Sequence, residues 1–280
     1  MSLKDITVVI ATFKSGEKIK KCLNSIDRRV QVLVIENSNN LEFKDNLEKK
    51  YSNVKCILSG GNIGYGSANN IGLKKVNTKY ALILNPDATL HHSTLENFIT
   101  ITKKITNFAI IGPYIQEEKN LHDKDYLKNS SPIEVENAKG FAMFLNIEEF
   151  KDIGFFDENF FFYFEEIDLC KRLRKNKKKI YLVPEIKIDH DGGVSHDGAI
   201  NIEMEMSRNW HWMWSTFYYH KKYRGFLNSL FIILPKLSSA IIKVCIYSLI
   251  FNKKKKIYYQ RLSGLINAIM GKSSWYRPNV

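Results

Sequence analysis

The 280-residue chain is 44% hydrophobic, which is enough for a sizeable folded core and excludes a disordered protein. Its 42 basic and 29 acidic residues give a formal charge of +13, so an anionic partner is expected: phosphorylated ligands, a phospholipid surface or nucleic acid. Its four cysteines, Cys22, Cys56, Cys170 and Cys245, form no C-x-x-C pair, which argues against a zinc knuckle or a disulfide framework and predicts reduced thiols in a cytosolic compartment.

Short apolar runs alternate with amphipathic stretches through the first half of the chain, and the first run follows Met1 so closely that no signal peptide is expected. Runs 6–11, 32–35, 54–58 and 81–84 predict strands buried on both faces, because almost every position in them is apolar. Helices are predicted at 17–26, 41–51, 67–76 and 94–104, the last introduced by a capping box at Ser93 and Glu96. This alternation predicts a mostly parallel α/β sheet.

The second half of the chain continues the pattern and then changes character. A polar loop is predicted over 116–138, followed by structure at 140–146, a helix at 165–175, and strands at 180–183 and 186–189. From about residue 203 the chain is predicted to be helical, and aromatic, basic and apolar stretches alternate along it. We therefore predict an α/β domain over 1–202 and a helical tail over 203–280.

Polar or glycine-rich residues follow each of the first four predicted strands, where a parallel sheet binds its ligand. They are Thr12, Glu36-Asn37, Gly60-Gly61-Asn62 and Asn85-Pro86-Asp87. The stretch 60–72 lacks the G-K-[ST] of a P-loop and the third small residue of the dinucleotide fingerprint. It can bring backbone close to a nucleotide, with Asn62 and Asn70 supplying amides, or be no more than a glycine-eased turn before a tightly packed helix.

Asp87 and His190 are candidate metal ligands. A carboxylate held by a proline-stiffened turn at a strand end suits Mg²⁺ or Mn²⁺, although Asn-Pro-Asp is also a common turn sequence. His190 comes at another predicted strand end, where a histidine can bind a metal or serve the fold alone.

Three carboxylates, Glu165, Glu166 and Asp168, directly follow the aromatic run 160–164. An apolar wall can raise the basicity of a carboxylate and make it a general base. Acids in a first helical turn also complement the helix dipole, and Asp168 with Arg172 looks like an ordinary surface pair. The adjacent aromatic residues favour a functional role for Glu165 or Glu166.

Taken together and in order, several segments resemble family 2 glycosyltransferases of the GT-A fold, most closely their bacterial rhamnosyltransferase-like branch, which builds cell-surface polysaccharide. The resemblance covers roughly residues 5 to 200. Its motifs are Val8 to Phe13 (with Ala11, Thr12 and Phe13), Val34 to Ser38, Asn62 to Gly66, Asn69 to Gly72, Leu84 to Asp87, Gly154 to Glu158, Phe161 to Cys170, Val183 to Glu185, and His190-x-x-Gly193-x-Ser195.

The resemblance implies a GT-A catalytic domain over 1–202 and a role for each matching residue. Donor-binding residues would be Ala11, Thr12, Phe13, Glu36, Asn62, Gly64, Asn70, Asn85 and Asp87, with Thr12 and Glu36 on the nucleoside. Asp87, helped by His190, would hold the Mg²⁺ or Mn²⁺ that bridges the diphosphate. Glu166 would be the catalytic base.

Two positions depart from the family pattern. Glu36 stands where the family usually has Asp, and Glu165-Glu166 where it usually has Glu-Asp. The second departure leaves Glu165 and Asp168 open as alternative bases. The implied reaction is inverting: the base deprotonates an acceptor hydroxyl, which attacks the anomeric carbon as the nucleotide diphosphate leaves.

The tail predicts attachment to a membrane surface. Residues 226–251 are apolar but interrupted by Pro235, Lys236 and Lys243, and aromatic residues and lysines flank them, which suits a helix lying in the interface. The alternatives are packing on the catalytic domain or a homodimer contact. We expect a cytoplasmic protein, peripheral on the inner face of the membrane, that meets a glycan or lipid-linked acceptor.

Two other functions compete with sugar transfer. The non-Asp residues at 36 and 166 would suit a catalytically weak or degenerate protein that binds membranes or polyanions. The basic run Lys171 to Lys179 could bind nucleic acid, but no nucleic-acid-binding motif accompanies it, so a solvated helix end is expected there and no nucleic-acid partner.

Overall fold

The structure is a computed structural model that describes residues 2–113, 132–192 and 201–278. The chain divides into two compact units. Unit 1 comprises residues 1–156 and 169–197, and unit 2 comprises 157–168 and 198–280. The segment 157–168 thus belongs with the C-terminal helices. The domain boundary predicted near residue 202 stays a prediction.

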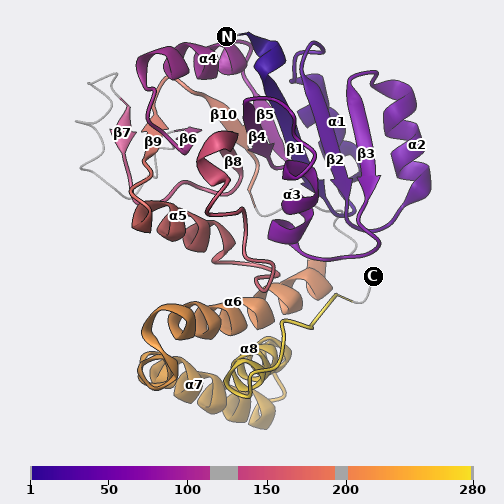
Figure 1. The fold of residues 1–280 in the computed structure, drawn as a ribbon. Coiled ribbons are helices and arrows are strands. Elements are labelled where there is room, and N and C mark those ends of the chain that lie inside the picture. Colours follow the sequence, from indigo (N-terminus) through magenta and orange to yellow (C-terminus); the bar gives the residue numbers. More distant parts are fainter. Residues whose placement is uncertain (1, 114–131, 193–200, 279–280) are drawn as a thin grey trace. The chain divides into compact units, whose positions relative to one another are not determined.

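Unit 1 is built on a mixed eight-stranded sheet with the strand order β3-β2-β1-β4-β8-β6-β9-β7 (Figure 1). Four neighbouring strands are parallel, and β8 runs antiparallel to both of its neighbours. The bounds are β1 Ile6–Thr12, β2 Gln31–Glu36, β3 Val54–Leu58, β4 Tyr80–Leu84, β6 Ile110–Pro113, β7 Ile133–Glu134, β8 Ala142–Asn146 and β9 Ile180–Val183. The predicted α/β class with a mostly parallel sheet is confirmed.

Helices cover both faces of this sheet. Alternate residues of a strand point to opposite faces, so Val8 and Ile10 pack with α1, α2 and α4, whereas Val9 packs with α3 and α5. Gly72 lets α3 approach β1, because a Cβ there would come 2.4 Å from Val9 Cγ1. The helices are α1 Gly16–Asn24, α2 Leu41–Lys50, α3 Tyr65–Leu73, α4 Thr94–Lys104 and α5 Glu165–Lys175, with short 3-10 turns at Leu3–Asp5 and Ile147–Phe150.

The start of α4 differs in detail from the prediction. The helix begins after Ser93 as expected, but the Ser93 side chain caps no backbone N–H, so the predicted capping box is wrong. Its hydroxyl instead lies 3.4 Å from the side-chain amide of Asn97. Thr94 fixes the helix start by donating to the carbonyl of Lys187 at 2.7 Å, a contact 93 residues away in the chain.

A separate two-stranded sheet pairs β5 (Ala88–Leu90) antiparallel with β10 (Ile188–His190). Its register sets Ala88 opposite His190, and the amide of Asp191 donates to the carbonyl of Asp87 at 3.3 Å. This pairing brings together the two residues that the sequence proposed as metal ligands. Gly193 and Ser195, which complete the histidine motif, lie outside the described residues.

The basic run 171–179 is largely engaged within unit 1. Arg172 donates to the carbonyls of Ile153 and Gly154, and Lys178 pairs with Glu149 at 2.7 Å. Lys179 and Arg174 pair with glutamates 134 and 136. These contacts are those of a solvated protein surface.

Unit 2 contains three helices, α6 (Asn201–Arg224), α7 (Phe226–Leu249) and α8 (Lys254–Ile269), which pack against one another (Figure 1). Buried aromatic residues of α6, among them Trp210, Trp214 and Phe217, join Ile233 of α7 and Leu265 of α8 in one core. Among the described helices, α7 is long and apolar enough to cross a membrane, judged by length and composition. Pro235 lies inside it without ending it.

A buried histidine fastens the C-terminal segment to α6. His211 Nε2 donates to the carbonyl of Tyr276 at 2.8 Å, and its Nδ1 lies 3.0 Å from the Ser274 hydroxyl. Burial lowers the pKa of His211 to about 3. The bond to the Tyr276 carbonyl acts to raise this pKa, and the positive charge of Arg277 acts to lower it further. The imidazole is therefore neutral in the folded protein at physiological pH.

Unit 2 should consequently lose stability in acid. An unfolded histidine has a pKa near 6.5, so between about pH 6.5 and 3 only the unfolded state binds this proton. The free energy of unfolding should fall as the pH decreases through that window, by up to about 1.4 kcal/mol per pH unit. Urea unfolding at several pH values measures this, and tryptophan fluorescence reports on unit 2 because all four tryptophans lie there. His211→Gln should flatten the slope, whereas the exposed His92→Gln should leave it unchanged; equal slopes in both variants would contradict the assignment.

Candidate functional site

The carboxyl ends of β1, β2 and β4 meet at one edge of the sheet in unit 1, because these strands are parallel neighbours. Thr12, which ends β1, is buried, and its hydroxyl has no hydrogen-bond partner in the part of the chain that the structure describes. Ala11 and Phe13 flank it. The Thr12 carbonyl accepts from the amide of Asn37, which ties the two strand ends together at 2.8 Å.

Glu36 is buried at the end of β2, and its carboxylate organises the loop that follows. One oxygen accepts from the amide of Ser38 at 2.9 Å and from its hydroxyl, and the other accepts from the amide of Asn40 at 2.6 Å. The side chain of Asn40 then caps α2 through the amide of Phe43. In the structure Glu36 fixes the backbone of the loop that follows β2. Its predicted contact with the nucleoside stays a prediction.

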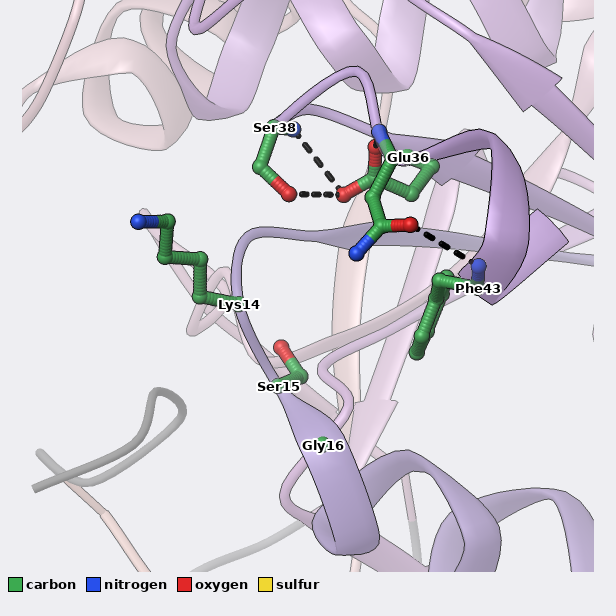
Figure 2. A pocket seen from close by; sticks show the side chains of 7 residues that line it. Lys14, Ser15, Gly16, Glu36, Ser38 and Phe43 are labelled. Atoms are coloured by element: carbon green, nitrogen blue, oxygen red, sulfur yellow. Dashed lines mark hydrogen bonds between the residues drawn. The ribbon is translucent and has the colours of Figure 1, made fainter. Parts of the chain in front are cut away.

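This loop borders a pocket of about 310 Å³, whose lining includes Lys14, Ser15, Gly16, Glu36, Ser38, Asn40 and Phe43. Figure 2 shows Lys14 and the ring of Phe43 on opposite sides of it. An aromatic ring can stack on a base, and an ammonium group can bind a phosphate. No sequence pattern indicates Lys14 or Phe43, because each acquires its place only through the loops that meet here.

The glycine-rich segment is fastened to the same edge by Asn37. The side-chain oxygen of Asn37 accepts from the amide of Ile63 at 3.0 Å, and its nitrogen donates to Asn62 at 3.2 Å. Gly64 has a φ of 91°, a left-handed conformation that a glycine adopts without strain, and α3 starts directly after it. Asn62 and Gly64 thus lie at the strand edge, as a donor pocket requires, while Asn37 does the positioning.

The side-chain amide of Asn70 bonds the backbone of a neighbouring loop. Its side-chain nitrogen donates to the carbonyl of Phe156 at 2.9 Å, and its oxygen accepts from the amide of the same residue at 3.0 Å. The buried amide therefore fixes the backbone of the 154–156 loop. Its predicted donor contact is not tested by this geometry.

Asn70→Ala should lower the free energy of unfolding of unit 1 by about 2–4 kcal/mol, because it leaves two buried backbone groups unpaired. Asn69→Ala is a matched control: among the described residues the side-chain amide of Asn69 bonds one group, the carbonyl of Tyr65 within α3, so the substitution should cost under about 1 kcal/mol. Urea unfolding followed by circular dichroism measures both. Unchanged stability in Asn70→Ala, together with weakened nucleotide binding, would instead support the donor contact.

Asp87 and Asn85 supply oxygens suited to a hard cation. The Asp87 side chain is only 1% exposed, and its Oδ1 lies 3.4 Å from His190 Nε2. This oxygen and Asn85 Oδ1 are both buried and accept no hydrogen bond from any described residue. The turn is closed by the Ala88 amide, which donates to the Asn85 carbonyl at 3.1 Å, and His190 stacks on Phe141 at 4.4 Å.

These residues fit a divalent cation that is shared with a ligand. Carboxylate and amide oxygens are the donors that Mg²⁺ prefers, and Mg²⁺ commonly keeps only one or two protein carboxylates beside water and phosphate oxygens. No group of three or more His, Cys, Asp or Glu side chains suited to a metal occurs among residues 2–113, 132–192 and 201–278. Asp87, with Asn85 and His190, would thus provide a partial coordination shell that a diphosphate completes.

The three acids at the start of α5 belong to unit 2 and differ in their surroundings. Glu165 is buried, and burial together with the charge of Glu166 raises its pKa well above the usual range. Its Oε2 accepts no hydrogen bond from the described residues. Glu166 is half-buried.

Asp168 is fully buried, and its carboxylate is paired with a lysine. Its Oδ1 accepts from the hydroxyl of Tyr223 at 2.7 Å and from Lys222 Nζ at 2.6 Å. Lys222 also bonds Asp157, at 2.7 Å, and Tyr218 donates to the same Asp157 oxygen. Burial acts to raise the pKa of Asp157, but the hydrogen bonds from Lys222 and Asn159 outweigh it, so the pKa is lowered. A lysine that bridges two aspartates ties segment 157–168 to α6, which is a structural role that the sequence did not reveal.

The backbone before these acids is strained. Tyr163 and Phe164 both have positive φ, at 68° and 71°, although neither is glycine. Each such residue costs about 1–3 kcal/mol and persists where the surrounding contacts enforce it. Those contacts are rings of α6: Trp212 lies 5.2 Å from Tyr163 and 5.5 Å from Phe164. Strain of this kind often marks a functional turn, and here it sets the first turn of α5.

The polar strand edge of unit 1 thus combines a pocket beside Phe43 with candidate cation ligands at Asp87 and Asn85, on a mostly parallel α/β fold. The chain superposes on the mannosyltransferase PcManGT from Pyrobaculum calidifontis, solved with GDP-Man and Mn²⁺, with a TM-score of 0.61 over 96% of this chain and 88% of that one, at 12% identity. The predicted GT-A fold is thereby confirmed.

The model of glycosyl transferase family 2 matches residues 7–170, and the chain belongs to this family. It is 29% identical over 204 residues to the low-salt glycan biosynthesis hexosyltransferase Agl10 of Haloferax volcanii, an alignment that covers 64% of each protein. It is 28% identical over 220 residues to the rhamnosyltransferase WbbL of Escherichia coli K12, covering 66% of this chain and 83% of that protein. The chain thus spans just under two thirds of the length of Agl10.

Proposed function

We propose that the protein is an inverting glycosyltransferase, which moves a hexosyl or rhamnosyl group from a nucleotide-diphosphate donor to a hydroxyl of a glycan or lipid-linked acceptor in cell-surface polysaccharide synthesis. The observation that carries the proposal is the edge of the unit 1 sheet. There the buried oxygens of Asp87 and Asn85, which accept no hydrogen bond from any described residue, share a strand edge with a pocket of about 310 Å³.

The donor would be held by unit 1. Phe43 and Glu36 border the space for the nucleoside, Lys14 is suited to a phosphate, and Asp87, Asn85 and His190 would hold Mg²⁺ or Mn²⁺. The cation, when bound, supplies positive charge that stabilises the departing diphosphate. Thr12, Asn62 and Gly64 complete this edge.

Glu166 would serve as the base. Burial and the charge of Glu166 raise the pKa of Glu165, which favours the neutral form of Glu165 and makes the less buried Glu166 the better candidate for a charged base. Glu166 takes the proton of the acceptor hydroxyl, whose oxygen bonds to the anomeric carbon as the bond to the diphosphate breaks. The transition state has oxocarbenium character, as in glycoside hydrolysis, and configuration inverts because no side chain forms a glycosyl intermediate.

The location is proposed as the inner face of the cytoplasmic membrane, where a lipid-linked acceptor is available. The support is α7, which is apolar and largely unburied within unit 2.

A thermal-shift screen of nucleotide sugars with Mn²⁺ or Mg²⁺ tests the proposal, beginning with deoxythymidine-diphosphate rhamnose. A cognate donor at 100 times its Kd should stabilise the protein by about 2.7 kcal/mol. Transfer or donor hydrolysis by the purified protein separates an enzyme from a degenerate binding module. Absence of both stabilisation and turnover across the screen would contradict the proposal.

A further inference from the structure

A second pocket, of about 300 Å³, lies wholly within unit 2 between its three helices. Its lining comes from α6, α7 and α8 and includes Trp212, Pro235, Lys236, Ser239, Tyr258 and Arg261. It has no part in the donor site of unit 1.

The pocket combines two cations with aromatic walls. Arg261 stacks over Tyr258 at 5.1 Å and donates through Nε to Asn209 at 2.6 Å, which leaves its terminal nitrogens available. Neither Arg261 nor the exposed Lys236 pairs with a carboxylate within the described part of the chain. Lys243 adds a third cation over Tyr258, at 4.9 Å. An arginine held in place by stacking, with its planar fork available, is suited to the oxygens of a phosphate.

An unpartnered apolar face adjoins this pocket. On α7 the side chains between 45% and 79% exposed recur at helical spacing and form a stripe made of Leu227, Phe231, Leu234, Ile241, Ile242, Ile246 and Leu249. With 3.6 residues per turn, Lys236, Ser239 and Lys243 fall on the flank between this stripe and the buried residues Ser229, Ile233 and Ala240. Apolar residues and phosphate-binding cations are therefore arranged side by side along one helix.

This arrangement matches the layers of a bilayer interface, in which phosphates lie just above the acyl chains. It does not match a spanning helix. Lys236 is the eleventh residue of the 24-residue α7 and would lie near the bilayer centre, where a lysine is costly.

We propose that this pocket of unit 2 binds the phosphate headgroup of an anionic membrane phospholipid while the stripe on α7 lies among the acyl chains. The inference rests on the proposed membrane location and adds the site that recognises the lipid. Trp212 links this pocket to the proposed base, since its ring contacts Tyr163 and Phe164, which directly precede Glu165. Lipid binding would hold this turn at the membrane surface, where a lipid-borne acceptor presents its hydroxyl.

The test is co-sedimentation of the full chain with phosphatidylglycerol-containing vesicles and with pure phosphatidylcholine vesicles. The wild type should bind the anionic vesicles at least tenfold more tightly. Lys236→Gln with Arg261→Gln should weaken this binding by about 30-fold, at about fivefold per cation. Lys253→Gln with Lys254→Gln removes the same charge outside the pocket and should cost markedly less.

Two further variants test the two parts of the proposal. One distinguishes phosphate recognition by the pocket from general charge attraction, and the other distinguishes insertion of the apolar stripe from contact with the membrane surface. Arg261→Lys keeps the charge but loses the planar fork, and should weaken binding at least threefold. Phe231→Ser should release the protein from vesicles, whereas Ile202→Ser, an equally exposed apolar residue of α6, should not. Folding of every variant is checked by tryptophan fluorescence.

Several results would overturn the proposal. An equal loss of vesicle binding in the double variant within the pocket (Lys236→Gln with Arg261→Gln) and in the double variant outside it (Lys253→Gln with Lys254→Gln) would indicate unspecific charge attraction. Binding of glycerol 3-phosphate as tight as that of vesicles would indicate a soluble phosphate ligand, and a stable dimer that buries α7 and ignores vesicles would indicate a second copy as the occupant. Resistance to alkaline extraction would indicate a spanning helix. Donor binding and transfer are measured separately, so that failure of this proposal remains distinct from failure of the proposed function.

Discussion

Replacing Asp87 with alanine is expected to lower the rate of sugar transfer by about 10²-fold or more, while the protein remains folded. The loss follows from the removal of the carboxylate that would hold the cation against the leaving diphosphate, an electrostatic contribution that usually amounts to several kcal/mol. Stability should be unchanged or increased, because Asp87 Oδ1 is a buried charged oxygen without a hydrogen bond from any described residue.

Initial rates at saturating donor and Mn²⁺ or Mg²⁺ measure the effect, and thermal unfolding checks the fold. Asp189→Asn is a matched control, since Asp189 lies next to His190 on β10 but is 68% exposed, and His91 is its one side-chain partner among the described residues. It should retain near-normal turnover. Near-normal turnover of Asp87→Ala at saturating metal would remove Asp87 from the cation site.

Glu166→Gln is expected to reduce turnover by about 10²- to 10⁴-fold, the usual contribution of a positioned base. Donor affinity should survive, because the base acts on the acceptor. Glu165→Gln should be milder, since glutamine resembles the protonated carboxyl group that a raised pKa favours at this buried position. Single-turnover rates and donor titrations in the same buffers separate binding from chemistry.

Asp168→Asn provides the contrasting case. It weakens the buried pairing with Lys222, so it should lower the stability of unit 2 by about 1–3 kcal/mol, with turnover lost only in proportion to unfolded protein. If Asp168→Asn or Glu165→Gln is instead the variant that abolishes turnover while staying folded, then Glu166 is not the base.

Sequence patterns predicted the first part of the fold well. The apolar runs at 54–58 and 81–84 coincide with β3 and β4 to within one residue, and the helix predicted at 94–104 is α4. The helix is long enough to show a clear apolar period, and β4 is buried at every position, which requires near-continuous apolar residues. The predicted burial on both faces is wrong for β3, an edge strand in which Lys55 is exposed. Order along the chain was then enough to place Thr12, Glu36 and Asp87 at one edge of a parallel sheet.

Short elements were missed. The three-residue strand β5 exists because it pairs with β10, which overlaps the strand predicted at 186–189. The two lie about a hundred positions apart, and no local period reveals such a pair. The same limit hid the role of Lys222, whose two aspartate partners lie more than fifty residues away. The capping box at Ser93 is wrong although its sequence pattern is present, because the Ser93 hydroxyl lies beside the side-chain amide of Asn97 and accepts no bond from a backbone N–H.

The sequence by itself determined the fold class, the family resemblance and the order of polar strand ends, because these depend on local periodicity and on motifs a few residues long. Only the tertiary structure decided what each side chain does. It turned the amide of Asn70 onto the backbone of Phe156, enclosed the carboxylate of Glu36 in its own loop, and left one oxygen each of Asp87 and Asn85 without a hydrogen bond from any described residue. Hydrogen-bond partners and burial depend on residues distant in the chain, and packing alone brings those residues within reach.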